Sequence, residues 1–107
     1  MARAIVGTVI NHSLGECKLD IAWYGNGRLC IMAMCDDGQT MGKLTVNIPE
    51  VHLREGQYCI KTWSENEELA RLCMETGLFE DTGIRIPQGM VEAQVWEKKE
   101  GVNLITK

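Results

Sequence analysis

A single short helix, bounded on both sides by strand-like sequence, is the feature that most constrains this fold. Ser64 is a residue type that caps helix N-termini, and Glu67 lies three positions later, as in a capping box. Leucines follow at helical spacing, and Gly77 supplies the left-handed residue with which many helices end. We therefore predict a helix over residues 65–76. A helix of this length is marginal alone, so it must pack on another element, and its flanking sequence indicates a sheet.

Strand patterns separated by turn residues fill the remainder of the chain. Alternating apolar and polar residues predict strands over 17–23 and 90–96. The dipeptide Asn26-Gly27 predicts a tight hairpin. The apolar run Leu29–Cys35 predicts a central strand that is covered on both faces. Further strands are expected at residues 3–10, 42–48 and 58–63, with a short edge strand at 102–105.

These elements predict one α+β domain over residues 1–107. We expect a strongly twisted antiparallel sheet of about five or six strands, with the helix 65–76 packed across it. In the expected strand 42–48, Leu44 faces inward and Thr45 outward. Residues 78–88 contain Gly83 and Pro87 and are predicted to be irregular.

Composition favours a globular protein in a reducing compartment. The five cysteines are scattered and odd in number, unlike the even disulfide frameworks of secreted proteins. Residues 1–10 carry one arginine and no small-residue cleavage site, so we interpret them as a strand and not as a signal peptide. The longest apolar run is too short to cross a bilayer. We expect a soluble, cytoplasmic protein without a membrane partner.

The formal net charge of −4 argues against nonspecific binding to a nucleic-acid backbone, which needs Lys and Arg to displace counterions. We therefore expect no nucleic-acid partner.

A zinc set could be assembled from Cys17, Cys30, Cys35 and His12. Structural zinc ligands, however, usually come in pairs two to four residues apart, and none of these cysteines has such a partner. Free cysteine is among the most buried residue types. Core packing is therefore the favoured interpretation of the cysteines, and no metal or cofactor residue is predicted.

A thiol–imidazole pair could be formed by Cys59 or Cys73 with one of the two histidines, His12 or His52. A catalytic cysteine needs a lowered pKa, from a helix N-terminus or an adjacent cation. Cys73 lies near the C-terminal end of the predicted helix, and Cys59 lies within a strand. Thiol catalysis is therefore not favoured, and no catalytic residue is predicted.

Between Glu65 and Asp81 the chain carries six acids and one base, Arg71. This surface either binds a basic partner, imitates the phosphates of nucleic acid, or only keeps the protein soluble, and the last interpretation is favoured. Trp96 falls on the Glu92/Gln94 face of its strand and is predicted to be an exposed anchor, whereas the other two tryptophans, Trp23 and Trp63, are expected in the core. The candidate partner surface comprises Glu65, Glu68, Glu75, Glu80, Asp81 and Trp96.

Short motifs from Lys43 onward carry a family resemblance. They are Leu44-Thr-Val-Asn-Ile-Pro49, Ile60-Lys-Thr-Trp-Ser-Glu-Asn-Glu67, Thr82-Gly83 and Gly89-Met-Val91. They resemble a family of small uncharacterised proteins on conjugative elements, plasmids and prophages of Firmicutes and gut bacteria. That family shows an "LTVNLP" strand, an "IKDWSEN" helix start, a "GL…TG" exit and a late glycine before a final strand. The resemblance implies an accessory gene of a mobile element, and it implies no chemistry.

The leading hypothesis is a non-catalytic accessory protein of a bacterial mobile element that acts through protein–protein contacts. One alternative is an acidic, DNA-mimicking antagonist of a host defence nuclease. Another is a small enzyme or ligand binder. A homodimer could form through an edge strand such as residues 3–10 or 102–105, because unpaired strand edges invite pairing.

Overall fold

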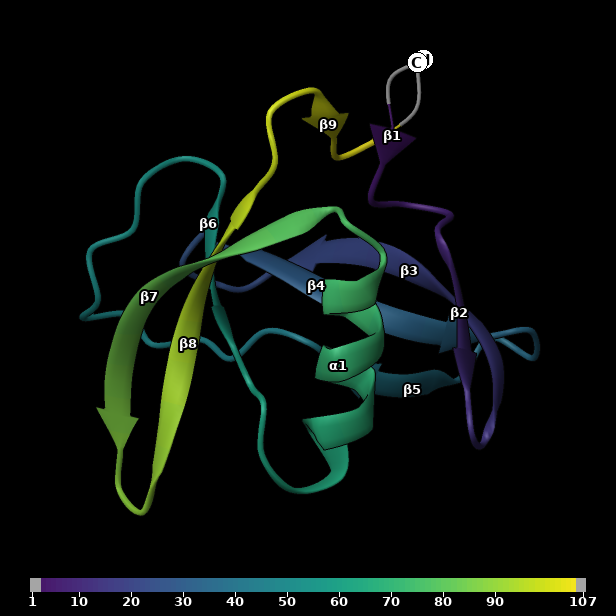
Figure 1. The fold of residues 1–107 in the computed structure, drawn as a ribbon, viewed down its shortest axis with the longest axis horizontal. Coiled ribbons are helices and arrows are strands. Elements are labelled where there is room, and N and C mark those ends of the chain that lie inside the picture. The colour runs from purple at the N-terminus through teal and green to yellow at the C-terminus, as the bar shows by residue number, and fades with distance from the viewer. Residues whose placement is uncertain (1–2, 106–107) are drawn as a thin grey trace.

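The computed structural model describes residues 3–105 as a mostly-strand α+β fold with one α-helix (Figure 1). The predicted fold class is therefore confirmed. Within the described residues the elements are β1 (Arg3–Ala4), β2 (Val9–His12), β3 (Gly15–Trp23), β4 (Leu29–Cys35), β5 (Thr40–Lys43), β6 (Gln57–Ile60), the 3₁₀ turn η1 (Ser64–Asn66), α1 (Glu67–Glu75), β7 (Phe79–Gln88), β8 (Val91–Lys98) and β9 (Val102–Asn103).

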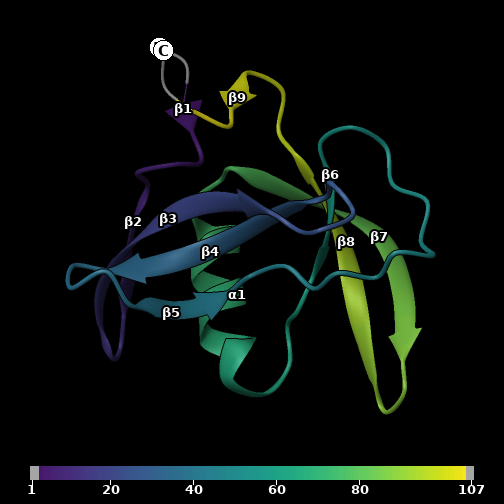
Figure 2. The same cartoon turned by 180° about the vertical axis from the view of Figure 1, so that it is seen from behind.

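Within residues 3–105 the strands form two antiparallel sheets and one parallel pair. One sheet has the order β2-β3-β4-β5, the other has the order β6-β8-β7, and β1 pairs with β9. Figure 2 shows β3, β4 and β5 in front of α1, with the β7–β8 hairpin to one side. The strands are thus divided among three sheets, and do not form the one sheet that was predicted.

The segment after β5 joins the two antiparallel sheets. Thr45 forms an antiparallel bridge with Ile60. Beside it, the Val46 N–H donates to the Cys59 carbonyl at 3.0 Å, and the Lys61 N–H donates to the Leu44 carbonyl at 2.9 Å. On its other side this segment bonds to β4, where the Leu44 N–H donates to a carbonyl of that strand. Residues 44–46 therefore form backbone hydrogen bonds with β4 on one side and with β6 and Lys61 on the other, although they are not a regular strand.

The start of the helix differs from the prediction. Ser64 has a φ of +54° and opens a 3₁₀ turn, so it does not cap α1, and neither helix start carries a side-chain cap. The polar residue before α1 is Asn66, which is buried. Its amide donates to the carbonyls of Lys43 and Lys61. The predicted capping box is wrong because Asn66 fastens the helix start to neighbouring backbone.

The end and the buried face of the helix agree with the prediction. Gly77 has a φ of +77°, the left-handed conformation that suits glycine. Leu69, Ala70 and Cys73 are buried and belong to the larger of two apolar clusters, together with residues of β2, β3 and β4. Burial of one leucine side chain contributes roughly 1.5–3 kcal/mol, so this face holds the helix on the sheet. Leu78, which follows the glycine, is fully buried.

Residues 78–88 were predicted to be irregular, and most of them form β7. The strand pairs with β8, and its register shifts between Asp81 and Arg85, which accommodates Gly83 at a φ of +86°. Pro87 is tolerated because β7 lies at the edge of its sheet, where one side of the strand needs no hydrogen-bond donor. The long-range pairing with β8 thus overrides the local breakers.

The first predicted strand, 3–10, is interrupted by a turn at Gly7, which has a φ of +91°. Its first part pairs with the end of the chain, because Arg3 lies opposite Val102 and Ala4 lies opposite Asn103. The two segments considered for pairing across a dimer axis therefore supply strands that pair with each other.

No helix in residues 3–105 is both long enough and apolar enough to span a membrane.

Candidate functional site

The acidic residues predicted to form a partner surface lie on two elements and are mostly paired. Glu65, Glu68 and Glu75 lie on η1 and α1, whereas Glu80 and Asp81 lie on β7. Three of the five acids form an ion pair with a base four residues away, and these bases reduce the net negative charge of the surface. The pairs are Lys61–Glu65, Arg71–Glu75 and Arg85–Asp81, with N–O distances of 2.6, 3.1 and 2.7 Å.

Glu68 serves a structural role on this surface. Its carboxylate accepts hydrogen bonds from the backbone N–H and the hydroxyl of Ser13, at 2.9 and 2.6 Å. His12 Nε2 lies 3.3 Å from the same carboxylate, while His12 Nδ1 accepts from the Leu14 N–H. The hydrogen bonds from Ser13 lower the pKa of Glu68 below its usual value. Glu68 therefore ties α1 to the β2–β3 turn.

Trp96 is buried, and the prediction of an exposed anchor at this position is wrong. Only 2% of its surface is exposed. It packs against Phe79 with ring centroids 5.8 Å apart, and its indole N–H donates to Gln94. The reason is that β8 is the central strand of its sheet, and near Trp96 both of its faces are covered. Trp96 belongs to the larger apolar cluster on one face of β8, and Val95 belongs to the second apolar cluster on the opposite face.

Trp23 is exposed, and the prediction of a core position is also wrong. It exposes 61% of its surface. Trp23 continues the inward phase of Leu19 and Ile21, but it is the last residue of β3, where it lies opposite Leu29 and directly precedes the turn to β4. Trp63 is half-buried and packs on the second cluster.

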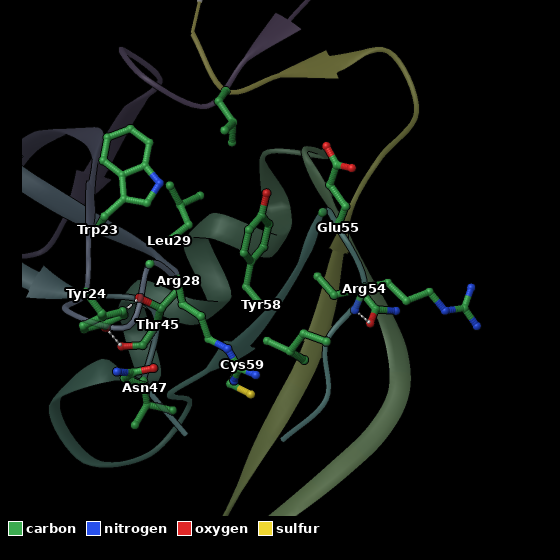
Figure 3. A pocket seen from close by; sticks show the side chains of 16 residues that line it. Trp23, Tyr24, Arg28, Leu29, Thr45, Asn47, Arg54, Glu55, Tyr58 and Cys59 are labelled. Carbon is green, nitrogen blue, oxygen red and sulfur yellow. Dashed lines mark hydrogen bonds between the residues drawn. The ribbon is translucent and has the colours of Figure 1, made fainter. Parts of the chain in front are cut away.

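A pocket of about 310 Å³ opens beside Trp23 (Figure 3). It is formed by three parts of the chain that are distant in sequence. The β3–β4 hairpin contributes residues 23–29, the connection between β5 and β6 together with the start of β6 contributes residues 45–47 and 53–59, and Leu104 follows β9. The joining segment 44–46 therefore also positions one wall of the pocket.

Hydrogen bonds hold the hairpin wall of the pocket against the connection. The Tyr24 hydroxyl lies 3.0 Å from the Thr45 hydroxyl and 3.3 Å from its carbonyl oxygen. Thr45 was predicted to face outward, and it is buried because its hydroxyl also accepts from the Ile31 N–H. The Arg28 guanidinium donates to the carbonyls of Ile48, at 2.7 Å, and Val51. This wall is therefore formed before any ligand arrives.

Trp23, Glu55 and Tyr58 line the pocket with polar side chains, and of the three Tyr58 is largely buried, with 7% of its surface exposed. None of their side chains makes a hydrogen bond within residues 3–105, although each has a polar atom. In Figure 3 the guanidinium of Arg54 points away from the pocket. Burial, and secondarily the charge of Glu55, raises the pKa of Tyr58 to about 12. Tyr58 is therefore a neutral hydroxyl at physiological pH.

The pocket does not assemble the thiol–imidazole pair that was considered from the sequence. Cys59 lines the pocket, but burial raises the pKa of its thiol despite the nearby charge of Arg28. Neither histidine lines the pocket. Among residues 3–105 no cluster of three or more His, Cys, Asp and Glu side chains could hold a metal ion. What the pocket offers is an aromatic surface, a hydroxyl and a carboxylate, which is chemistry for binding.

Sequence reasoning did not identify the pocket residues. One local signal could have identified Trp23: the residues that follow it predict a tight turn, and an inward-phased side chain at the end of a strand can lie outside the core. Glu55 and Tyr58 gave no comparable signal, because their position beside Trp23 depends on the long connection between the sheets.

No family model matches the chain, and neither a curated protein nor a solved structure matches it. The function is therefore inferred from the geometry of the site and from the sequence motifs.

Proposed function

We propose that this protein is a non-catalytic accessory protein of a bacterial mobile element, and that it binds a protein partner at the pocket beside Trp23. One observation carries the proposal. A large aromatic side chain is exposed at a pocket whose hairpin wall is already fixed by hydrogen bonds. Tryptophan is the residue type most enriched among binding hot spots, because its burial removes a large apolar area from water.

The charge around the pocket indicates the chemistry of the partner. Glu55 makes no ion pair within residues 3–105, and Glu97 and Glu100 line an adjoining hollow. Two bases also line that hollow: Lys98 donates to the Val102 carbonyl, and Arg54 points its guanidinium away from the pocket in Figure 3. We therefore propose a partner segment with an apolar side chain that packs on Trp23, next to a Lys or Arg that approaches Glu55. Complementary charge of this kind directs orientation and association rate.

The cellular setting of the proposal comes from the sequence. The motifs shared with proteins of conjugative elements, plasmids and prophages support a mobile-element accessory role, and the five free thiols fit a cytoplasmic location. The DNA-mimic alternative has less support, because a phosphate-like surface needs unneutralised carboxylates, and three of the predicted acids have a base beside them.

A displayed library of random peptides tests the proposed site directly. The library is selected on the intact protein, and each selected peptide is then measured against Trp23→Ala and Met90→Ala. Met90 is the matched control, because it is a large apolar residue that is fully exposed and does not line the pocket.

We expect the selected peptides to combine an apolar residue with Lys or Arg. Trp23→Ala should weaken their binding roughly thirtyfold, the size of a 2 kcal/mol hot spot, and Met90→Ala should leave it unchanged. Selected peptides that bind Trp23→Ala as tightly as the unaltered protein, or that are consistently acidic, would overturn the proposal.

A further inference from the structure

Two of the free cysteines lie directly opposite each other on neighbouring strands. Cys17 of β3 pairs with Cys35 of β4 in the antiparallel register. The Cys35 N–H donates to the Gln39 carbonyl, on the side away from β3, so the two cysteines do not exchange backbone hydrogen bonds. Side chains at such a position lie on the same face of the sheet and approach each other closely.

The spacing of this pair suits a disulfide. Opposed residues without mutual backbone hydrogen bonds have Cα atoms about 4.5 Å apart, which lies within the range of about 4.4–6.8 Å found across disulfides. Cys17 also contributes to the raised pKa of Cys73, so a third thiol lies close by on α1. By contrast, Cys30 on the same strand β4 lies opposite Ala22, which offers no thiol.

We propose that Cys17 and Cys35 form a reversible oxidation site, which a small disulfide compound converts into an intrachain disulfide. Cys35 is half-buried and is the member of the pair that the oxidant can reach, whereas Cys17 is fully buried. Burial, together with the neighbouring Cys35 and Glu16, raises the pKa of the Cys17 thiol. Cys17 therefore acts second, as the resolving thiol.

The reaction proceeds in two thiol–disulfide exchanges. In the first, the Cys35 Sγ attacks one sulfur of the small disulfide, whose S–S bond breaks, and the thiol that leaves takes up the proton from Cys35. In the second, the Cys17 Sγ attacks the Sγ of Cys35, and the second small thiol leaves with the proton from Cys17. The two cysteines are oxidised by two electrons, and one small disulfide is reduced to two thiols.

Oxidised glutathione added to the full-length native protein tests this proposal. Because a disulfide consumes two thiols, the number of free thiols should fall from five to three. Mass spectrometry under non-reducing conditions should place the new bond between the peptides that contain Cys17 and Cys35. Trypsin leaves Cys30 and Cys35 in one peptide, so Cys30→Ser is included to identify the linked residue.

Matched variants distinguish the pair from general thiol oxidation. Cys30→Ser should still form the disulfide, whereas Cys35→Ser should retain all four of its remaining thiols in the time that closes the native bridge. Cys35 is only half-buried, so this variant is expected to fold, and its circular dichroism spectrum checks this. A bridge from Cys17 to Cys73, a glutathione adduct on Cys35 that persists without closing, or no loss of thiols in the folded protein would overturn the proposal.

Discussion

The acidic surface along α1 and β7 and the pocket beside Trp23 use the same residue types in opposite ways. On the acidic surface, charged side chains pair with one another in solvent, and the nearby tryptophan, Trp96, is buried beneath. At the pocket, Arg28 is bonded to backbone carbonyls, and the tryptophan is exposed. An exposed tryptophan such as Trp23 therefore indicates a binding site better than a high density of charged residues does, because the charged residues pair with one another.

The two tryptophans should respond very differently to truncation. Trp96→Ala should destabilise the fold by about 3–5 kcal/mol, because it leaves a cavity beside Phe79. Trp23→Ala should change the free energy of unfolding by less than about 0.5 kcal/mol, because the side chain is mostly in solvent. Urea denaturation followed by circular dichroism measures both. Equal losses of stability would remove the distinction between a structural and a functional tryptophan.

The stability of the hairpin wall of the pocket should depend on Arg28 and not on Arg54, although both residues line the pocket. Arg28→Met removes two hydrogen bonds from a charged donor to carbonyls and should cost about 3 kcal/mol. Arg54→Met is the matched control, since no hydrogen bond of its guanidinium is found within residues 3–105, and a change below about 0.5 kcal/mol is expected. If both variants are equally stable, the wall is not held by Arg28.

On the acidic surface, Glu68 should contribute a pH-dependent part of the stability. Its pKa is lowered in the folded state, chiefly by the Ser13 hydrogen bonds, so its contribution is present above the ordinary value of 4.5 and disappears as the pH falls through the folded pKa. The difference in unfolding free energy between the native protein and Glu68→Gln, measured from pH 7 to pH 3, should therefore shrink toward acid. A difference that does not change with pH would contradict this role.

The smallest effect is expected for the exposed pair on the outer face of the helix. Glu75→Gln breaks one ion pair with Arg71, both of whose side chains are more than half exposed. Such helical pairs contribute only about 0.3–0.5 kcal/mol. A melting temperature within a degree or two of the native protein, at low and at high salt, is the expected result. A much larger loss would show that the acidic surface has a structural role beyond its local pairs.

Local sequence determined those parts of the fold that depend on near neighbours. Gly77 ended the helix as predicted, and the alternation in β3 and β8 gave both strands. The failures came from distant partners. β7 forms despite Gly83 and Pro87 because β8 supplies its hydrogen bonds. The capping box does not form because the helix start is instead held by Asn66, whose side chain donates to the backbone carbonyls of Lys43 and Lys61.

The candidate site was out of reach of sequence reasoning for the same reason. Its three parts come together only when the connection between β5 and β6 packs against the β3–β4 hairpin. The alternation of apolar and polar residues in the sequence does not predict that contact. Trp23 and Trp96 were assigned the wrong environments because exposure depends on which strand is central in its sheet and on where along a strand the residue lies. Neither property is a local one.

The joining segment 44–46 has a consequence for how the molecule loses its structure. Because these residues bond to β4 on one side and to β6 on the other, neither sheet can open along that line without exposing the backbone of its neighbour. Melting should therefore be cooperative across the two antiparallel sheets. Probes attached near Met90 and near Leu14, at the far tips of the two sheets, should report one shared transition midpoint.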